Sequence, residues 1–408
     1  MLYRLAAVTL ASTLLVSCGD ESPFSDFTTS TTTTTTSGGG GGDGGTVTGT
    51  GTGGGSVSVS SIVRKTQIPL TLPDGMGGTV GAAFVSYDMG NGDTSISYIL
   101  DDSTNWHIFR PDASGPFKLY SRPAMDLPYT TTSGDGNKIL LQRYTDVVDY
   151  TDGNVTSIGS LLGAFTWPQT ISDAGDVVAF VSNDDLAPGT NPAGVNQLFT
   201  LSTDGADTYN QITSFTNNHR IDSVVISGDG RRIFFGSNSD VLGDVTVSGN
   251  VYEVFAINTD SSGLAQLSNF NTAEVRVTRS SSDGSVIAVE AMDLIVPDVK
   301  HILAFNTATG THTEIAATFG LNSTVHYDMS ADGSRATYLA AGVISGTKDI
   351  YVVNTTSGDK DVVLTESGFI GSLQMNTNGS QVSFYCNTAL DTPIGADEQS
   401  IQVYTMTL

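Results

Sequence analysis

The sequence predicts an all-β protein, a seven-bladed β-propeller, on the basis of three observations. Polar turns that contain Gly recur seven times, each is followed by short segments rich in Val, Ile, Tyr and Thr, and the chain stops one strand before its last unit is complete. These residue types favour a pleated, half-buried surface, and so small a unit buries its apolar faces only against its neighbours. We therefore expect a closed ring of sheets.

The clearest unit runs from Met329 to Thr365. A turn at 330–333 precedes an expected strand at 335–339, a second strand is expected at 349–354, and a third ends at Thr365. The Asp side chain of the turn bonds nearby backbone, and Gly333 supplies a positive φ without strain. This order of turn, strand, loop, strand, turn and strand is the repeating pattern.

The spacing of the repeats separates a constant part from a variable part. We call the polar residue that begins the second strand of a unit its opener. From an opener to the next turn glycine the spacing is 29 to 33 residues, as from His107 to Gly136. From a turn glycine to the opener of the same unit the spacing is 10 to 23 residues. Loops change length at little cost, whereas packed strands do not. The turn glycines are Gly92, Gly136, Gly175, Gly230, Gly284, Gly333 and Gly379, and the openers are His107, Asp146, Gln197, Glu253, His301, Asp349 and Ser400.

The two ends of the repeat region predict how the ring closes. The seventh unit has expected strands at 381–386 and 400–406, and the chain then stops at Leu408 without a further strand. A spare strand is expected upstream, at 64–72. Pairing this N-terminal strand with the last sheet would remove two exposed edges. An open sandwich or two separate β domains is the alternative.

The units resemble the TolB-like (WD40-like) propeller repeat family over residues 60–408. The family's Ser-x-Asp-Gly turn stands as Ser133-Gly134-Asp135-Gly136, and its Asp-Ile-Tyr-Val strand as Asp349-Ile350-Tyr351-Val352. The usual Pro after the Ser is missing, and the third unit has Asp173-Ala174-Gly175 in place of Asp-Gly. The resemblance implies a propeller fold and a role as a scaffold that contacts envelope proteins.

The N-terminal segment predicts export and anchoring. Residues 1–17 have the positive start and short apolar run of a lipoprotein signal peptide, and Leu15-Val16-Ser17-Cys18 resembles the bacterial lipoprotein cleavage box. We expect Cys18 to be lipidated, with an ordinary signal peptide and a chance Cys as the alternative. Residues 18–58 are rich in Thr and Gly and should form a disordered tether. Residues 59–408 should form the propeller.

Composition and motifs exclude several functions. The chain has 17 basic and 42 acidic residues and a net charge of −25, which repels nucleic acid. No H-E-x-x-H, C-x-x-C, Walker or G-x-S-x-G motif occurs, so we expect no catalytic residue, no resident metal and no enzyme activity. Cys386, without a partner once Cys18 is lipidated, should be a buried strand thiol.

The connections that lead into successive blades carry the candidate partner-binding residues. These connections should converge at one end of the channel, where aromatic side chains and Arg favour binding hot spots. The alternative is that the side chains fill the channel or pack between blades. The candidates are Trp167, His219, Arg220, Phe270, His326 and Phe369.

The expected function is that of a monomeric, lipid-anchored module that binds proteins in the bacterial cell envelope, on the periplasmic or surface side of a membrane such as the outer membrane. Two alternatives stay open. One is an envelope enzyme, a hydrolase or lyase acting on a polymer, with His219 and His326 as its starting residues. The other is a structural or adhesive protein whose acidic loops bind Ca²⁺; no cofactor is otherwise expected.

Overall fold

The computed structural model describes residues 57–73, 79–81, 83–90, 95–111, 117–123, 129–142, 146–157, 169–191, 194–204, 208–217, 220–239, 241–242, 252–270, 274–292, 299–319, 326–342, 344–391, 398 and 401–408. The chain divides into two compact units, Met1–Asp43 and Gly44–Leu408, and every described residue belongs to the second. The predicted signal peptide, Cys18 and nearly all of the tether lie outside the described residues. In the described part there is no helix, and so none that could cross a membrane.

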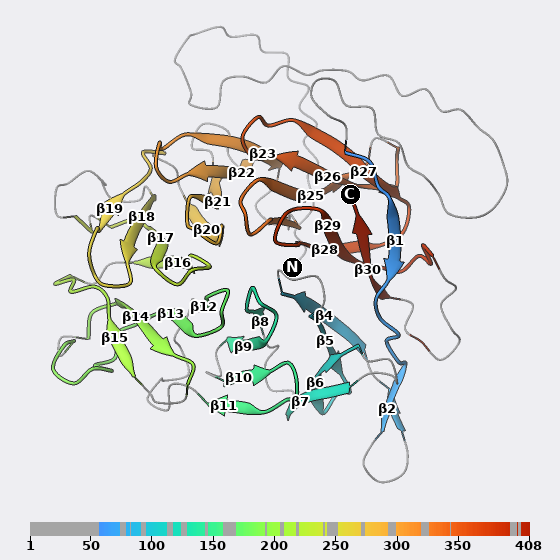
Figure 1. The fold of residues 1–408 in the computed structure, drawn as a ribbon, viewed down its shortest axis with the longest axis horizontal. Coiled ribbons are helices and arrows are strands. Elements are labelled where there is room, and N and C mark those ends of the chain that lie inside the picture. Colours follow the sequence, from blue (N-terminus) through green and yellow to red (C-terminus); the bar gives the residue numbers. More distant parts are fainter. Residues whose placement is uncertain are drawn as a thin grey trace, which may run out of the picture. The chain divides into compact units, whose positions relative to one another are not determined.

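Seven four-stranded antiparallel sheets form the blades of a propeller, arranged in a ring in Figure 1. Blade 1 is β4 (Ala83–Met89), β5 (Ile96–Asp101), β6 (Asn105–Arg110) and β7 (Phe117–Pro123). Blade 2 is β8 (Tyr129–Thr132), β9 (Lys138–Gln142), β10 (Asp146–Asp149) and β11 (Val155–Ser157). Blade 3 is β12 (Gln169–Ile171), β13 (Val177–Ser182), β14 (Gln197–Ser202) and β15 (Tyr209–Gln211). The seven-bladed all-β prediction is confirmed.

The remaining blades repeat this order. Blade 4 is β16 (Ile221–Ile226), β17 (Arg232–Ser237), β18 (Glu253–Asn258) and β19 (Ala265–Gln266). Blade 5 is β20 (Val275–Ser280), β21 (Val286–Met292), β22 (Val299–Asn306) and β23 (His312–Phe319). Blade 6 is β24 (Tyr327–Met329), β25 (Arg335–Ala341), β26 (Lys348–Asn354) and β27 (Lys360–Glu366). Blade 7 is β28 (Ile370–Met375), β29 (Gln381–Cys386), β30 (Gln402–Thr407) and β1 (Ser61–Arg64).

The antiparallel order gives the propeller two different ends. The turns between the first and second strands and between the third and fourth strands lie at one end, which we call the turn face. The loops between the second and third strands and the connections between blades lie at the other end, the loop face. The repeat pattern predicts three strands in a unit. The structure has a fourth, the innermost, which lies within the residues predicted to be connections, such as β24.

The N-terminal strand closes the ring as predicted, but with a different range. β1 pairs with β30 from Ser61 opposite Thr407 to Arg64 opposite Tyr404. The backbone N–H of Lys65 then donates to Val403, at 2.8 Å, before the chain turns away. The expected strand at 64–72 is therefore wrong in its bounds. Its last part instead forms β2 (Thr71–Pro73), which pairs with β3 (Thr79–Gly81) in a separate hairpin.

The third strand of each blade carries a buried polar side chain that makes a hydrogen bond to another segment of the chain. We call these side chains the clasp residues. In six blades the clasp residue bonds the fourth strand or the residues just after it, as Asp349 accepts from Thr365 Oγ1 at 2.7 Å. In blade 1 His107 bonds Asp102 instead. In blade 7 the position belongs to Gln402, not to the predicted Ser400, which lies outside the described residues. The clasp residues are His107, Asp146, Gln197, Glu253, His301, Asp349 and Gln402.

The blades pack through apolar faces that contain a recurring aromatic pair. In five blades an aromatic residue of the second strand stacks on its direct partner in the third, as Tyr338 does on Tyr351 with ring centroids 4.7 Å apart. Such a pair contributes about 0.5–1.5 kcal/mol beyond burial. Cys386 is fully buried beside these strands, and burial raises the pKa of its thiol. The other pairs are Tyr98–Phe109, Phe180–Phe199, Phe235–Phe255 and Phe384–Tyr404.

Candidate functional site in the central channel

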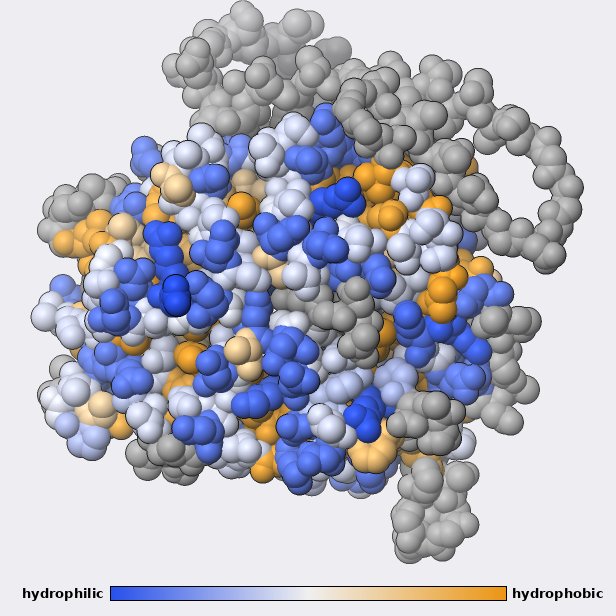
Figure 2. All heavy atoms as spheres, in the orientation of Figure 1, coloured by the Kyte–Doolittle hydropathy of each residue, from blue (hydrophilic) through white to orange (hydrophobic). Residues whose placement is uncertain are grey.

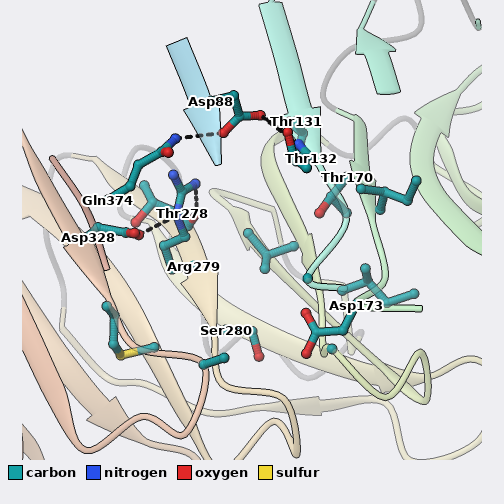
Figure 3. Close-up of a pocket in the computed structure, with 17 residues that line it drawn as sticks. Asp88, Thr131, Thr132, Thr170, Asp173, Thr278, Arg279, Ser280, Asp328 and Gln374 are labelled. Carbon is teal, nitrogen blue, oxygen red and sulfur yellow. Dashed lines mark hydrogen bonds and ion pairs between the residues drawn. The ribbon is translucent and has the colours of Figure 1, made fainter. Parts of the chain in front are cut away.

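The seven innermost strands surround a channel that contains a cavity of about 100 Å³ (Figure 3). Each of these strands contributes at least one lining residue, and most of the lining side chains are polar. A volume of this size holds several water molecules or a small polar group of a ligand. The strands supply Asp88, Thr131, Thr170, Val225, Arg279, Asp328 and Gln374, in the order of the blades.

Arg279 is the one basic side chain among the residues that line this cavity. A β-bulge at Thr278 shifts the register between β20 and β21 just before it. Its Nε donates to Asp328 Oδ1 at 2.7 Å, and one terminal nitrogen donates to the carbonyl of Thr278. The Arg279 side chain is nevertheless 49% exposed. Asp328 raises the pKa of Arg279 more than burial lowers it, so the guanidinium stays charged.

A chain of hydrogen bonds continues from Asp328 around the channel wall. Its second oxygen accepts from the backbone N–H of Met375 in blade 7, at 2.8 Å. The neighbouring Gln374 donates from Nε2 to Asp88 in blade 1, at 2.6 Å (Figure 3). Asp88 also accepts from the backbone and hydroxyl of Thr132 in blade 2. With the Arg279–Asp328 pair this links five blades, and it holds the Asp328 and Asp88 carboxylates in place.

At the turn face the cavity is bounded by the turns themselves. The backbone of each turn bonds the next from blade 2 to blade 7, for example from the N–H of Asp135 to the carbonyl of Asp173 at 2.7 Å. The Asp173 carboxylate crosses the turn of blade 4 to accept a bond from Ser282 in blade 5. A Cβ at Gly228 would lie 1.9 Å from this carboxylate, so any larger residue at this position would displace the Asp173 side chain. The departure of the third unit from Ser-x-Asp-Gly therefore puts a carboxylate at the end of the channel.

A second polar network lies behind the channel wall, between blades 5 and 6. The Tyr327 hydroxyl donates to Glu290 at 3.1 Å and lies 2.6 Å from the Thr278 hydroxyl. Lys300 pairs with the same Glu290. Burial and then the nearby Glu290 carboxylate raise the pKa of Tyr327 well above its usual value. The phenol therefore stays protonated and keeps Thr278, beside Arg279, in position.

Four of the six predicted partner-binding residues belong to the described part of the chain, and no contact between these four is observed. Trp167 and His219 lie outside the described residues. Phe270 is only 8% exposed and packs edge-on against Phe305 and His312. Phe369 is 53% exposed and rests on Tyr385. That these residues bind a partner stays a prediction.

Arg220 and His326 precede the innermost strands of blades 4 and 6, at the loop face. The Arg220 side chain is 67% exposed; its Nε donates to Asp222 at 2.8 Å, and its guanidinium lies over the Tyr252 ring. Burial, and then the bond to Asp222, raise the pKa of Tyr252 to about 12. His326 is half-buried, and burial followed by the Lys348 cation lowers its pKa. Its imidazole is therefore neutral near pH 7.

The acidic loops, whose calcium binding is one of the alternatives left open above, are only partly described. Asp185 accepts backbone bonds from 189–191 and so closes its own loop. Asp391 accepts from the backbone N–H of Arg64, beside the closing strand. Within the described ranges no three His, Cys, Asp or Glu side chains come together as a metal site. Calcium binding stays an open alternative, since the other acidic loop residues, Asp240, Asp244, Asp293, Asp298 and Asp397, lie outside those ranges.

The channel residues were not predicted from the sequence, although most of them lie at a fixed distance from the turn glycines. In blades 2 to 7 the position five residues before the turn glycine is a lining residue, and in blade 1 it is Tyr87, next to the lining residue Asp88; the six lining residues are Thr131, Thr170, Val225, Arg279, Asp328 and Gln374. Polar and charged residues at a fixed distance from a repeated turn would have identified one end of the channel wall.

Comparison with known proteins shows the fold. No family model and no curated protein match this chain. It is similar to an oligogalacturonate lyase solved with manganese (13% identity, TM-score 0.54, covering 85% of this chain and 98% of that one). It is also similar to an oligogalacturonate lyase from Vibrio parahaemolyticus (11% identity, TM-score 0.53, covering 86% and 98%). TolB from Acinetobacter baumannii is similar at 13% identity and a TM-score of 0.40, covering 80% of this chain and 79% of that one.

These comparisons confirm one prediction and correct another. The chain is a seven-bladed β-propeller, as its repeats predicted. The prediction that it is not an enzyme is contradicted, because two lyases share the fold over nearly their whole length. This fold occurs in enzymes, so the absence of a nucleophile motif does not exclude activity.

Proposed function

We propose that this protein is an enzyme that acts on a carboxylated oligosaccharide bound at the central channel. The observation that carries the proposal is Arg279, a half-exposed guanidinium inside a polar cavity, held in place by Asp328. A guanidinium binds carboxylates through several N–H groups in a fixed plane, and it keeps its charge at every working pH. The similarity to two oligogalacturonate lyases supports the same class of substrate.

The reaction that fits these residues is elimination next to a carboxylate. Neutralising the carboxylate makes the proton on the adjacent ring carbon easier to remove, which is the task we assign to Arg279. The imidazole of His326 takes that proton, the C–H electron pair forms a carbon–carbon double bond, and the glycosidic C–O bond breaks. Water protonates the leaving oxygen.

His326 suits the role of base for two reasons. Its lowered pKa keeps it neutral at neutral pH, so it can accept a proton. It also lies two residues before Asp328 at the same inner strand, so the rise of a strand puts their Cα atoms about 7 Å apart. We propose that a sugar unit bound to the guanidinium that Asp328 holds also contacts His326, which lies just outside the residues that line the cavity.

The location we propose is the bacterial cell envelope. The support is the sequence before the propeller, with its signal peptide, Cys18 in a lipoprotein cleavage box and a Thr- and Gly-rich tether. Two or more acyl chains on Cys18 would hold the protein on a membrane. Diffusible oligosaccharide fragments would then reach the channel through the loop face.

The test is turnover by the full mature chain. Oligomers of galacturonate and of other uronates are offered, and the conjugated double bond of the product is followed by ultraviolet absorbance. Arg279→Gln should lower kcat/KM by about 10- to 100-fold, the loss of one charge-assisted contact of about 1.5–3 kcal/mol. Arg231→Gln is the matched control, since Arg231 is an exposed residue of the turn face. Absence of turnover on every uronate oligomer, or equal activity of the two variants, overturns the proposal.

Protein binding at the loop face is a second candidate function, favoured by Phe369. Phe369 is more than half exposed, and its backbone N–H donates to Asn387 Oδ1 at 2.7 Å. The hydrogen bond fixes the backbone, so the exposed ring has a defined position. Site-specific photocrosslinking from position 369 in intact envelopes tests this. Crosslinks to one defined protein from position 369, and none to that protein from a crosslinker at position 117, would support protein binding. The same products from both positions would reject it. Phe117, 40% exposed on the outer strand of blade 1, is the matched aromatic control.

A further inference from the structure

The basic residues of the inner wall gather in one sector of the propeller. Among the described residues of the seven innermost strands and the residue just before each, the Arg and Lys side chains are Arg220, Arg276 and Arg279. All three belong to blades 4 and 5. This grouping of cations contrasts with the composition of the chain, which has 17 basic and 42 acidic residues. The face seen in Figure 2 is mostly hydrophilic, with apolar residues in small groups.

The β-bulge of blade 5 aligns two of these arginines. Arg276 pairs with Glu290 and Arg279 pairs with Ala288, two residues apart on the same neighbouring strand. Since alternate residues of a strand share a side, the extra residue in the bulge turns both arginines to the same side of the sheet. Their Cα atoms are about 7–10 Å apart along the strand. Without the bulge the two side chains would point to opposite sides.

Arg220 lies at the loop-face end of the same sector. The inner strands of blades 4 and 5 are joined by a bond from the Val277 N–H to Ser223 Oγ, at 2.9 Å. Glu274, which binds Arg276, also contributes to the raised pKa of Arg220, after Asp222 and Tyr252. Arg220 and Arg276 therefore interact with the same carboxylate, that of Glu274, on the loop-face side of Arg279.

The exposed arginines are held in a way that leaves donors for a ligand. Arg220 binds Asp222 through Nε, and Arg276 binds Glu274 through Nε at 2.6 Å. Both side chains are more than half exposed, and within the described residues their terminal nitrogens make no further hydrogen bond. A guanidinium fixed at one edge loses little freedom when its other nitrogens bind an anion.

We propose that Arg220 and Arg276 form anion subsites that continue from Arg279 toward the loop face, and that the ligand is a linear oligomer with an acidic group on successive units. This rests on the proposed function for the Arg279 site. The three cations would contact different carboxylates of one chain, so a single sugar unit would use only Arg279. Chain length then determines affinity.

The experiment is isothermal titration of the full mature chain with monogalacturonate and with trigalacturonate. Wild type should bind the trimer more tightly than the monomer. The double variant Arg220→Gln and Arg276→Gln should lose about tenfold or more in affinity for the trimer and bind the monomer as wild type does. Arg231→Gln, on the turn face of blade 4, should change neither affinity.

The outcomes separate this inference from the proposed function. If wild type prefers the trimer and the double variant keeps that preference, the subsites are refuted while Arg279 can still bind a carboxylate. If the double variant weakens monomer and trimer equally, the two arginines act on the Arg279 site and not as separate subsites, and the inference also fails. If wild type binds neither saccharide, both the inference and the proposed function fail.

Discussion

Replacing Gln402 with Leu should loosen the closure of the ring. Gln402 is fully buried in β30, and its Oε1 accepts two bonds from the N-terminal segment, from Thr66 Oγ1 and from the backbone N–H of Ile68, each at 3.0 Å. Leu has nearly the same size but no acceptor, so two buried donors lose their partner. Each unsatisfied group costs about 1–3 kcal/mol, so we expect the free energy of unfolding to fall by about 3 kcal/mol.

The loss translates into a modest but measurable change in Tm. The unfolding entropy of about 2.1 cal/mol/K per residue, over the roughly 350 residues of the propeller, gives about 0.7 kcal/mol/K, so the Tm should fall by about 4 °C. Calorimetry measures this, and amide exchange should become faster at 60–68 before it does elsewhere. Gln67→Leu, an exposed neighbour, should shift the Tm by less than about 1 °C. Equal shifts in the two variants, or unchanged exchange at 60–68, would refute the closure mechanism.

Three further predictions concern the anchor, the tether and pH. Cys18→Ser should release the protein from membranes or stop its processing, as fractionation would show; unchanged membrane association removes the lipoprotein assignment. Deleting 28–56 should leave the Tm unchanged, whereas deleting 60–72 should expose an edge of blade 7 and cause aggregation, so identical behaviour of the two deletions contradicts ring closure. Stability should fall below about pH 4. Burial alone would raise the pKa of the turn carboxylates, but their hydrogen bonds lower it below the pKa in the unfolded chain, so these groups stabilise the fold only while they are ionised. A Tm that is equal at pH 3 and pH 5 would contradict this. The carboxylates are Asp135, Asp283 and Asp332.

The repeat could be read from the sequence because its turns have strict local chemistry. Ser330 Oγ donates to Asp332, whose carboxylate accepts from the Ser334 backbone, and Gly333 has a φ of 71°. Each requirement restricts the residue type, so the turn recurs as a visible motif. The strand predicted at 349–354 is observed as Lys348–Asn354.

The innermost strands could not be read in the same way. β24 and β12 have three residues each, too few to show an alternating pattern. Their partners and the channel determine their conformation more than their own composition does. The placement of Arg279 depends in addition on the bulge at Thr278, which is a property of how β20 pairs with β21. Sequence alone therefore predicted the ring but missed the residues inside it.

The closing strand shows the same limit. The segment 64–72 has a suitable composition, yet only Arg64 of it belongs to β1. The position of the strand follows from the two bonds to Gln402, a residue more than 300 positions away in the chain. Long-range pairing of this kind leaves no local signal.

The most direct test of the account is a crystal structure of the protein with trigalacturonate bound. We predict that one carboxylate of the ligand lies within about 3 Å of the terminal nitrogens of Arg279, with the chain running past Arg276 toward Arg220 at the loop face. A ligand bound at the outer edge of a blade or at the turn face, with the channel around Arg279 free of saccharide, would contradict the account.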